Sequence, residues 1–392
     1  MVNKIDCDVI VVGAGLVGLT AAIALSLQHK KVVLVSDKSM PDLSLNLNID
    51  SWDERVYALT PTTEAWFKDI GVWHYVNENR VNPIDAMHIW GAETDLVLNA
   101  TDANVAKLGL IIENQQLMAA LWQKLQTLDV TVVTDARGTK IEHSANAVIL
   151  HTEPAMQINA KLIVAADGLQ SWVRQQADIA VNVKNYHQVA VVANFMAENP
   201  HNNEAKQWFG VHDILALLPL PNHHVSMVWS VSTEKAAQLL ALTSEQLCEQ
   251  VQAQSQGLMG KLTLIGQVKN AALNQQTASP LIAERVVLVG DAAHQVHPMA
   301  GQGVNLGFRD VMQLAQLTTK LHPMQDMGER AFLRQYERAR KADVMSMNSL
   351  TSGLDYLFAT EQTLLKKLSS WGLKAIGRQA SLKKLLIKQA VH

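Results

Sequence analysis

Cysteine is scarce in this sequence, with only Cys7 and Cys248 among 392 residues. Two cysteines can build neither a disulfide framework nor a zinc site, which favours a reducing, cytoplasmic setting. Long apolar runs are absent as well, and no stretch reaches the roughly eighteen apolar residues that a membrane-spanning helix needs. The formal net charge of −3 gives no overall electrostatic reason to expect a nucleic-acid partner.

The N-terminal segment contains a candidate first strand. Its apolar run, DVIVV at residues 8–12, follows Asp6, begins with Asp8 and leads directly into a glycine turn. A secretory signal would have a longer uninterrupted apolar core, so we expect folded structure here.

A βαβ pattern starts at this strand. The turn GAGLVG opens an apolar helix, and residues 32–35 predict the second strand. In such a unit the first glycine permits a tight turn, the second lets the backbone approach a pyrophosphate, and the third lets helix and strand pack closely. The helix N-terminus favours the negative charge of phosphates. A tight turn without a ligand is the alternative. The candidate dinucleotide-binding residues of this turn are Gly13, Gly15, Val17 and Gly18.

One position departs from the dinucleotide pattern. An acidic residue at the end of the second strand would hold the adenosine ribose hydroxyls, but Ser36 occupies that place and Asp37 follows it. Either the Asp37 carboxylate reaches the ribose or Ser36 makes a weaker, neutral contact. The sequence leaves both open.

Two later segments repeat the order of strand, Asp/Gly turn and helix. In LIVAADGLQSWVRQ, Asp167 precedes Ser171 and Arg174, and capping of a helix by Asp or Ser is the simpler interpretation of this segment alone. In RVVLVGDAAHQVHP, Gly290 and Asp291 follow a strand. An aspartate at the end of a strand can accept hydrogen bonds from ribitol or ribose hydroxyls.

A glycine-rich segment follows the second of these motifs. HPMAGQGVNLGFRD, residues 297–310, contains three glycines around Gln302 and Asn305. Glycine at this density is costly in conformational entropy, which predicts that another group approaches the bare backbone closely.

Together these motifs resemble those of the flavoprotein monooxygenases of the para-hydroxybenzoate hydroxylase family. That family has a GxGxxG turn, a DG motif and a GD motif in this order. Residues 297–310 are similar to the signature H-P-aliphatic-small-G-Q-G-x-N-x-G-x-x-D of its ubiquinone-biosynthesis hydroxylases, with the volume-conserving Met299 in the aliphatic position. The blocks at 54–73 and 108–121 resemble two further family blocks, so the resemblance extends to about residue 345.

The resemblance implies FAD as the cofactor, with its pyrophosphate on the first glycine turn and its ribitol on Asp291. The backbone of Gly303, Val304 and Asn305 would face the pyrimidine side of the flavin ring and stabilise negative charge there. The further cofactor-binding residues that it implies are Gly290, Pro298 and Gly301.

Four side chains fall where the family contacts its cofactors. Arg55 and Asn114 would touch the dinucleotide; the alternatives are a surface ion pair for Arg55 and a helix cap for Asn114. Asp167 and Arg174 would support FAD and the docking of NADPH or NADH, the reductant that the resemblance implies.

The chemistry implied by the resemblance is the cofactor's. Reduced flavin reacts with dioxygen, forms a hydroperoxide and transfers one oxygen atom to a phenolic ring, while the protein excludes water. Pro298 falls where the family presents a backbone carbonyl to the reacting ring, and it is our one candidate catalytic residue. A polyprenylated phenol or quinol precursor of ubiquinone is the implied substrate.

The predicted fold is α/β, with a Rossmann-like FAD-binding domain, an inserted antiparallel-sheet substrate domain and a helical C-terminal tail. The predicted boundaries are 1–75, 101–180 and 276–345 for the first domain, 76–100 and 181–275 for the second, and 346–392 for the tail.

Within the second domain, alternating apolar segments between residues 187 and 232 predict strands, and TSEQLCEQVQAQSQ predicts a helix capped by Thr243 or Ser244. Trp208, Phe209 and Trp229 are candidates to line the substrate pocket. Burial in the core of the sheet is the commoner fate of such residues.

The tail has a charge pattern of its own. Residues 362–392 contain seven Lys and Arg and no Asp or Glu, and Leu364, Leu368, Trp371 and Ala375 recur at helical spacing. A basic amphipathic helix fits an anionic membrane surface or a partner of a quinone-synthesis complex, and a packed helix with a solvated face is the alternative. We therefore expect a cytoplasmic protein with possible peripheral attachment at the inner face of the membrane.

Three other functions are compatible with parts of this pattern. A hydroxylase of a soluble aromatic acid would use the same scaffold, and a scaffold subunit of a quinone-synthesis complex would keep the flavin for structure. A disulfide reductase is disfavoured because the redox CxxxxC pair is missing. His294 and His297 lack a third nearby ligand, so we expect no metal.

Overall fold

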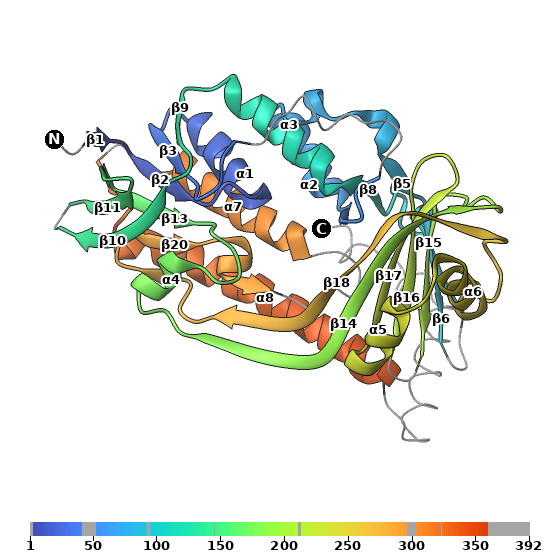
Figure 1. Cartoon of the computed structure of the whole chain (residues 1–392). Helices are drawn as coiled ribbons and strands as arrows, with labels where there is room; N and C mark the ends of the chain where they lie inside the picture. Colours follow the sequence, from blue (N-terminus) through green and yellow to red (C-terminus); the bar gives the residue numbers. More distant parts are fainter. Residues whose placement is uncertain are drawn as a thin grey trace.

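The computed structural model describes residues 3–40, 52–91, 95–144, 146–210, 213–295, 303–322 and 324–359, with side chains up to residue 345. Four sheets and the helices around them form two main parts (Figure 1).

The first part is a Rossmann-like sheet with the strand order β19-β20-β13-β2-β3-β9, in which all pairs are parallel except β19–β20. Its strands are β2 (Val9–Val12), β3 (Val32–Val35), β9 (Val130–Val133), β13 (Leu162–Ala165), β19 (Ile282–Ala283) and β20 (Val286–Leu288). The central strands are buried apolar runs because helices cover them, as parallel sheets require. The first strand predicted from the sequence is β2.

The helices of this part are α1 (Leu16–Ser26), α2 (Pro61–Asp69), α3 (Asn114–Gln126), α4 (Trp172–Gln176), α7 (Gly303–Thr319) and α8 (Arg330–Ala359). Because β3 and β13 flank β2 on opposite sides, the connections leaving β2 and β13 diverge at the carboxyl ends of these strands. Ligands of open α/β sheets bind at such a switch point.

The second part is an eight-stranded sheet with the order β21-β18-β14-β17-β16-β15-β6-β7. Its strands are β6 (Ala86–Trp90), β7 (Asp95–Asn99), β14 (Val181–Ala197), β15 (Glu204–Phe209), β16 (Ile214–Pro219), β17 (His224–Ser232), β18 (Leu262–Ala278) and β21 (His294–Gln295). The predicted antiparallel sheet is confirmed, except that β6 and β15 pair in parallel. The 17-residue strands β14 and β18 run beneath the first part and into the second (Figure 1). The domain boundaries stay a prediction.

Helices α5 (Thr233–Leu240) and α6 (Ser244–Gln254) pack on one face of this sheet. The predicted capping box is confirmed, with Thr243 and not Ser244 as the cap: the Thr243 hydroxyl accepts from the Gln246 amide at 3.3 Å, and the Gln246 side chain accepts from the Thr243 amide at 3.0 Å.

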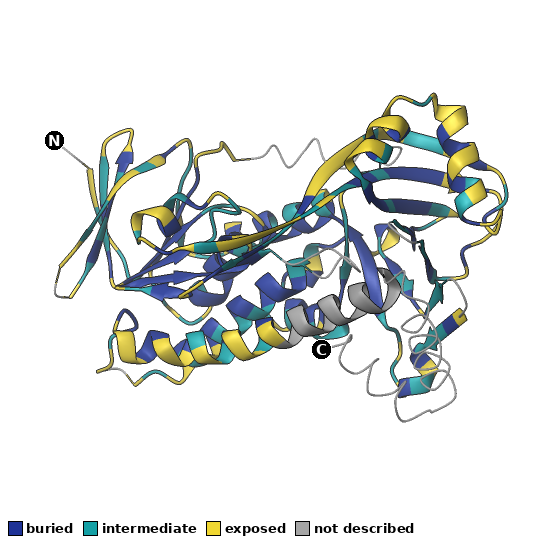
Figure 2. Cartoon of the chain, turned by 90° about the horizontal axis from the view of Figure 1, so that it is seen from below, coloured by how far each residue is buried: buried dark blue, intermediate teal, exposed yellow. Residues whose placement is uncertain are grey.

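Smaller elements complete the described chain. A sheet that the sequence did not predict joins β1 (Asn3–Asp6), β10 (Arg137–His143), β11 (Val148–Glu153) and β12 (Met156–Ala160), and another joins β4 (Val56–Leu59), β5 (Asn82–Ile84) and β8 (Gly109–Glu113). The short 3-10 helices are η1 (Trp73–Tyr75), η2 (Glu78–Arg80), η3 (Ala100–Ala103) and η4 (Gly290–Ala292). Buried residues concentrate in the strands and on the inward helix faces (Figure 2). Within the described ranges, no helix combines the length and apolarity needed to cross a membrane.

Candidate FAD and substrate site

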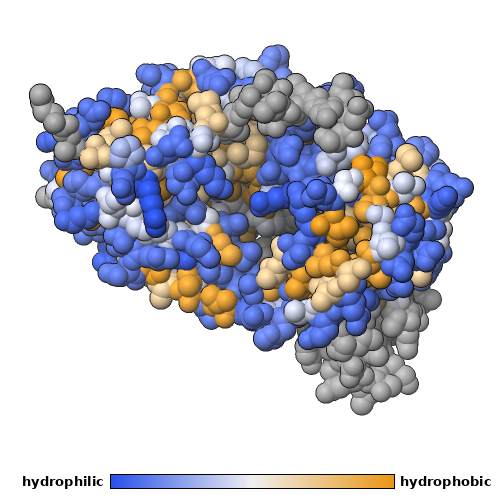
Figure 3. Space-filling model, in the orientation of Figure 1, coloured by the Kyte–Doolittle hydropathy of each residue, from blue (hydrophilic) through white to orange (hydrophobic). Residues whose placement is uncertain are grey.

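A large cavity lies between the two parts of the fold. Its volume is about 1370 Å³, and its walls come from the carboxyl ends of the Rossmann strands and from one face of the eight-stranded sheet. A recess is visible at this place in the middle of Figure 3. Pockets for one drug-sized ligand measure roughly 300–1,000 Å³, so this cavity has room for a dinucleotide together with a second molecule.

The three glycines after β2 have different surroundings. A Cβ atom on Gly13 would lie 2.3 Å from the Ala166 carbonyl oxygen, and one on Gly18 would lie 1.9 Å from the Gly13 carbonyl oxygen. A Cβ atom on Gly15 would have no atom within 4 Å, and Gly15 lines the cavity at the N-terminus of α1. The first and third glycines therefore serve packing. The second leaves open space in front of a helix N-terminus, which fits a pyrophosphate.

The end of β3 forms another wall of the cavity. Ser36 and Asp37 both line it, and the buried Ser36 hydroxyl accepts a hydrogen bond from the Lys38 amide at 3.1 Å. Which of the two residues contacts a ribose stays open.

Two residues at this end escaped the sequence analysis. Arg137 and Trp172 line the cavity, and the Trp172 ring packs where a Cβ atom on Gly138 would lie, 2.4 Å away. Arg137 follows β9, the parallel neighbour of β3, and therefore lies at the carboxyl edge of the sheet. This position in the sequence could have identified Arg137 as a cavity residue.

The DG motif combines a helix cap with a cavity residue. Asp167 lines the cavity and accepts from the Ser171 hydroxyl at 2.5 Å and from the Val173 amide at 3.0 Å. Ser171 caps α4, as the simpler interpretation predicted. Burial raises the pKa of Asp167 against these hydrogen bonds.

Arg174 is placed differently from the prediction. Its guanidinium is buried and donates to the carbonyls of Ala292 at 3.0 Å and Leu169 at 2.9 Å. It therefore joins the DG and GD motifs from inside the protein, where it is buried and not available for direct contact with NADPH.

Three segments of the chain contribute a cluster of side chains to the cavity. Arg55, Tyr57, Asn114 and Asp291 all line the cavity. The Tyr57 hydroxyl donates to Asn114 Oδ1 at 3.4 Å, and the Arg55 guanidinium lies 5.4 Å from the Tyr57 ring centroid. No ion pair joins Arg55 to a carboxylate of the described chain, so the surface-pair alternative is not observed. The cap of α3 is Glu113 and not Asn114. Tyr57 was missed, although it lies in a block that the sequence analysis quoted.

The Arg55 backbone is held by a chain of contacts that ends in a buried ion pair. Its amide donates to Asp53 Oδ1 at 2.9 Å, and the Asp53 amide donates to Glu113 Oε1 at 2.7 Å. Glu113 in turn forms a two-pronged ion pair with Arg80, at 2.7 and 2.8 Å. The pair is almost fully buried and fixes the backbone that carries Arg55.

Asp291 faces the cavity from the turn after β20. Solvent reaches its carboxylate through the cavity, yet protein surrounds the group, and this burial raises its pKa although Arg55 and His294 act in the opposite direction. Burial therefore opposes ionisation of Asp291 and makes its charge costly, as expected of a side chain placed for a ligand.

We predict that Asp291→Asn makes the apoprotein more stable and lowers its FAD affinity by about tenfold or more, because a charged hydrogen-bond acceptor is lost. Since the folded pKa is raised, ionisation destabilises the fold at neutral pH, and the gain should shrink as the pH falls toward about 4. Thermal unfolding at several pH values and a fluorescence titration with FAD measure both effects. A variant apoprotein less stable than wild type at pH 7 would contradict the prediction.

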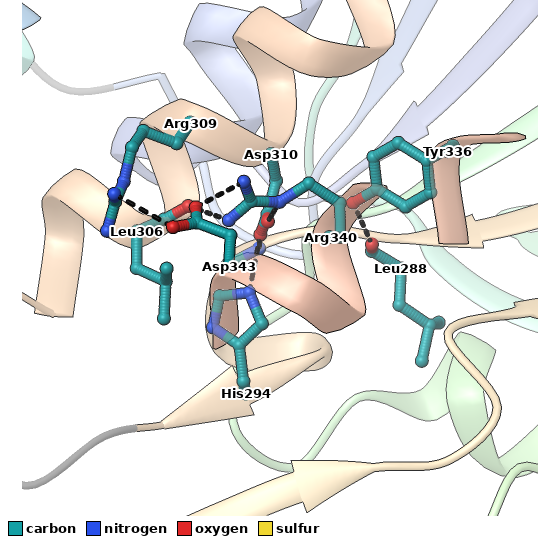
Figure 4. A network of polar contacts seen from close by, with 9 residues as sticks. Leu288, His294, Leu306, Arg309, Asp310, Tyr336, Arg340 and Asp343 are labelled. Carbon is teal, nitrogen blue, oxygen red and sulfur yellow. Dashed lines mark hydrogen bonds and ion pairs between the residues drawn. The ribbon is translucent and has the colours of Figure 1, made fainter. Parts of the chain in front are cut away.

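A buried ionic network lies beneath this turn (Figure 4). Asp310 has no solvent exposure and contacts the Gly290 amide at 2.8 Å, Arg340 Nε at 2.6 Å and His294 Nε2 at 2.8 Å. Burial alone would raise the pKa of Asp310, but His294 and Arg340 outweigh it and hold that pKa below its ordinary value. Arg340 also pairs with Asp343 at 2.5 Å. The network ties the GD turn to α7 and α8.

The start of α7 reaches the cavity through Gly303 and Val304. The Asn305 side chain is buried and turned inward: it accepts from the Thr60 amide at 3.2 Å and from the Thr63 hydroxyl at 3.0 Å, and donates to the Ala58 carbonyl at 2.7 Å. Asn305 thus anchors α7 to the β4–α2 turn.

The last glycine of the glycine-rich segment serves helix packing. A Cβ atom on Gly307 would lie 2.7 Å from a Val17 methyl group and 3.1 Å from Gly290 Cα. The two glycine clusters therefore meet at Val17, which also lines the cavity.

We predict that Gly307→Val lowers the free energy of unfolding by about 1–3 kcal/mol through overpacking. Val17→Ala removes the methyl groups that the new side chain would meet, so the double variant should recover part of this loss. Chemical denaturation of the four proteins of the cycle measures the coupling. Additive effects would contradict a direct contact.

The aromatic candidates of the second part divide between the two faces of its sheet. Phe209 lines the cavity. Trp208 and Trp229 are 3% and 1% exposed and belong to the core beneath α5 and α6, so their prediction as pocket residues was wrong. Neighbours on a strand point to opposite faces, so Trp208 and Phe209 cannot share one pocket.

Several predicted residues lie outside the described residues: Pro298, Gly301, His297 and the tail 362–392. Among the described residues, no group of three or more His, Cys, Asp or Glu could hold a metal ion.

Comparison with known proteins supports the interpretation of the cavity as an FAD site. Residues 6–351 match the family model described as FAD binding domain, so the chain belongs to this family and its cofactor is FAD. The predicted class, an FAD-dependent monooxygenase, is thereby confirmed.

Three relatives are ubiquinone-biosynthesis enzymes. The chain is 30% identical to "Ubiquinone hydroxylase UbiL" of Rhodospirillum rubrum, covering 98% of this chain and 89% of that protein. It is 30% identical to human "Ubiquinone biosynthesis monooxygenase COQ6, mitochondrial" (97% and 91% covered) and to "3-demethoxyubiquinol 3-hydroxylase" of Escherichia coli (98% of each covered).

Solved structures share the fold at lower identity. The p-nitrophenol 4-monooxygenase PnpA of Pseudomonas putida superposes with a TM-score of 0.79 at 16% identity, covering 99% of this chain and 98% of that chain. Klebsiella pneumoniae HpxO, complexed with FAD and uric acid, gives 0.74 at 17% identity, with 99% and 97% covered.

Proposed function

We propose that the chain is an FAD-dependent aromatic hydroxylase of ubiquinone biosynthesis that uses NADPH or NADH and dioxygen. Its proposed substrate is a polyprenylated phenol or quinol. The observation that carries the proposal is one continuous cavity, bounded at one end by a glycine turn suited to a dinucleotide and at the other by an apolar sheet face. The ubiquinone-biosynthesis relatives support it over nearly the whole chain.

A neutral ring fits the substrate end better than an aromatic acid. Of the charged side chains that line the cavity in the described part of the chain, only Lys269 comes from the eight-stranded sheet, and its ammonium lies 2.6 Å from the Glu54 carboxylate. A carboxylate substrate would be expected to meet a cation available for pairing. This favours a phenol over the soluble aromatic acid.

In the proposed mechanism, bound FAD would supply the redox chemistry by which NADPH or NADH provides two electrons to dioxygen, so that one oxygen atom enters the ring and the other leaves as water. The chain's own residues bind, orient and exclude water. Gly15 and the N-terminus of α1 would hold the pyrophosphate, and Asp291 the ribitol. The N-terminus of α7, at Gly303 and Val304, would stabilise negative charge on the flavin ring. Pro298 stays the proposed residue nearest the reacting ring.

We also propose peripheral attachment through the basic tail, residues 362–392, at an anionic membrane surface, because a polyprenylated substrate resides in the bilayer. Docking on a partner of a quinone-synthesis complex is the alternative. Flotation of the full chain with neutral and with anionic vesicles separates the two.

The enzyme proposal is tested with purified protein and with a deletion strain. The holoprotein should be yellow and should oxidise NAD(P)H faster when a phenolic substrate is present. Lipid extracts of the deletion strain should accumulate a prenylated, under-hydroxylated quinone precursor, detected by mass spectrometry. Protein that takes up no FAD on reconstitution would refute the proposal. If Gly303→Val stops flavin turnover but leaves quinone synthesis intact, the chain acts as a scaffold.

A further inference from the structure

We propose that Gln207 and Ser230 are the specificity-determining residues that bind oxygen substituents of the substrate ring. Each would form a hydrogen bond to one of two oxygen atoms on opposite edges of the ring. This inference rests on the proposed function and names the polar anchors of the same site.

Both side chains are buried and face the cavity without a partner. Ser230 is 7% exposed and Gln207 is 6% exposed, and both line the cavity. Neither side chain forms a hydrogen bond or an ion pair with the described residues. Their polar atoms are open to the cavity and are not among the solvent-free unpaired atoms of the described chain. A ligand in the cavity can therefore pair with them in place of water.

Their nearest neighbours on this sheet face are apolar. Ala216 lies between Gln207 and Val228 in the register of β15, β16 and β17. Ser230 lies between Ile214 and Ala190. A flat ring can therefore rest on this part of the face, where Gln207 and Ser230 supply the polar atoms.

The separation of the two anchors suits one ring. Gln207 and Ser230 are two strands and two residue positions apart, which places their Cα atoms roughly 12 Å from each other. Side chains on one face of a sheet stand roughly parallel, so the polar atoms of the two residues are separated by a similar distance. Two hydrogen bonds of about 2.8 Å, one at each end, then leave roughly 6 Å between the two bound oxygen atoms. That distance matches oxygen atoms on opposite edges of a six-membered ring, as in a quinol.

The test uses the holoprotein under anaerobic conditions with three probes, namely hydroquinone, phenol and benzene, and measures binding by the change in flavin absorbance. Wild type should bind hydroquinone most tightly and benzene least. Ser230→Ala and Gln207→Leu should each weaken hydroquinone binding by about three- to tenfold and leave benzene binding unchanged.

Ser226→Ala is the matched control. Ser226 lies on the same strand, is fully buried without a partner for its hydroxyl, and does not line the cavity. This variant should bind all three probes like wild type. Equal hydroquinone affinity in wild type, Ser230→Ala and Gln207→Leu would overturn the proposal, as would a wild type that does not discriminate hydroquinone from benzene.

A second measurement needs no flavin. Because the two polar groups form no hydrogen bond with the described residues, Ser230→Ala and Gln207→Leu should leave the Tm of the apoprotein unchanged or raise it. A lowered Tm would show that these groups stabilise the fold itself and would overturn the proposal. Failure of the protein to bind FAD would contradict the proposed function alone. The Tm of the apoprotein would still test the roles of Gln207 and Ser230.

Discussion

Gly15→Asp should reduce FAD affinity by at least about 100-fold while leaving the apoprotein folded. Gly15 has φ −77° and ψ −179°, a conformation open to any residue, and a Cβ atom there meets no atom within 4 Å. Asp is also a favoured N-cap, so α1 should keep its stability. Its carboxylate would occupy the space proposed for the pyrophosphate and repel it, and like charges in contact cost several kcal/mol.

Reconstitution followed by absorbance measures the FAD bound per chain, and circular dichroism with thermal unfolding measures the fold. Gly15→Ser is the control for charge and should lose less affinity. Gly18→Ser is the control for position and should unfold the protein, because its Cβ atom would lie 1.9 Å from the Gly13 carbonyl oxygen. Stoichiometric FAD in Gly15→Asp would refute this assignment of the glycine turn.

Asp310→Asn should lower the free energy of unfolding by about 3–5 kcal/mol, because it removes the charge that balances the buried Arg340. The substitution preserves size, so the loss reports charge and not a cavity. Asp343→Asn is the matched control: Asp343 also pairs with Arg340, but its side chain is 27% exposed, and the expected loss is about 1 kcal/mol or less. Urea denaturation measures both. Equal losses would contradict a special role for Asp310.

The effect of Asp310→Asn on the free energy of unfolding should depend on pH. Because the folded pKa of Asp310 is lowered, its contribution is fully present above the unfolded pKa of about 3.9 and is lost as the pH falls through the folded value. The difference between wild type and Asp310→Asn should therefore be present above about pH 4 and shrink as the pH falls below it. A difference that persists at the lowest pH would show that the Asp310 charge is not its source.

Local patterns predicted much of the scaffold. The strand, turn and helix around Gly13–Gly18 follow from hydrophobic period and glycine placement, and the cap of α6 follows from Thr243 and Gln246. These features depend on residues within a few positions of one another. For the same reason, the sequence located the carboxyl-end turns that carry Asp167 and Asp291.

Other parts of the site depend on contacts between distant segments. Arg137 reaches the cavity because it follows β9 at the carboxyl edge of the Rossmann-like sheet. Tyr57 does so because it lies near the start of β4, beside the end of its antiparallel partner β8. No motif marks either residue. Arg174 fits a cofactor motif, yet its guanidinium is used by the carbonyls of Ala292 and Leu169.

By itself, the sequence determined the class of fold, the glycine turn after β2, the order of the motifs and the strands of the second sheet between residues 187 and 232. Periodicity and glycine spacing act over short range, which is why they could be recognised. Only the tertiary structure decided which face of that sheet meets the cavity. Alternation places Trp208 and Phe209 on opposite faces. The packing of α5 and α6 then assigns Trp208 to the core, so that Phe209, Gln207 and Ser230 line the cavity. Burial and charge pairing, as at Asp310 and Arg340, are set by distant residues meeting in the folded chain.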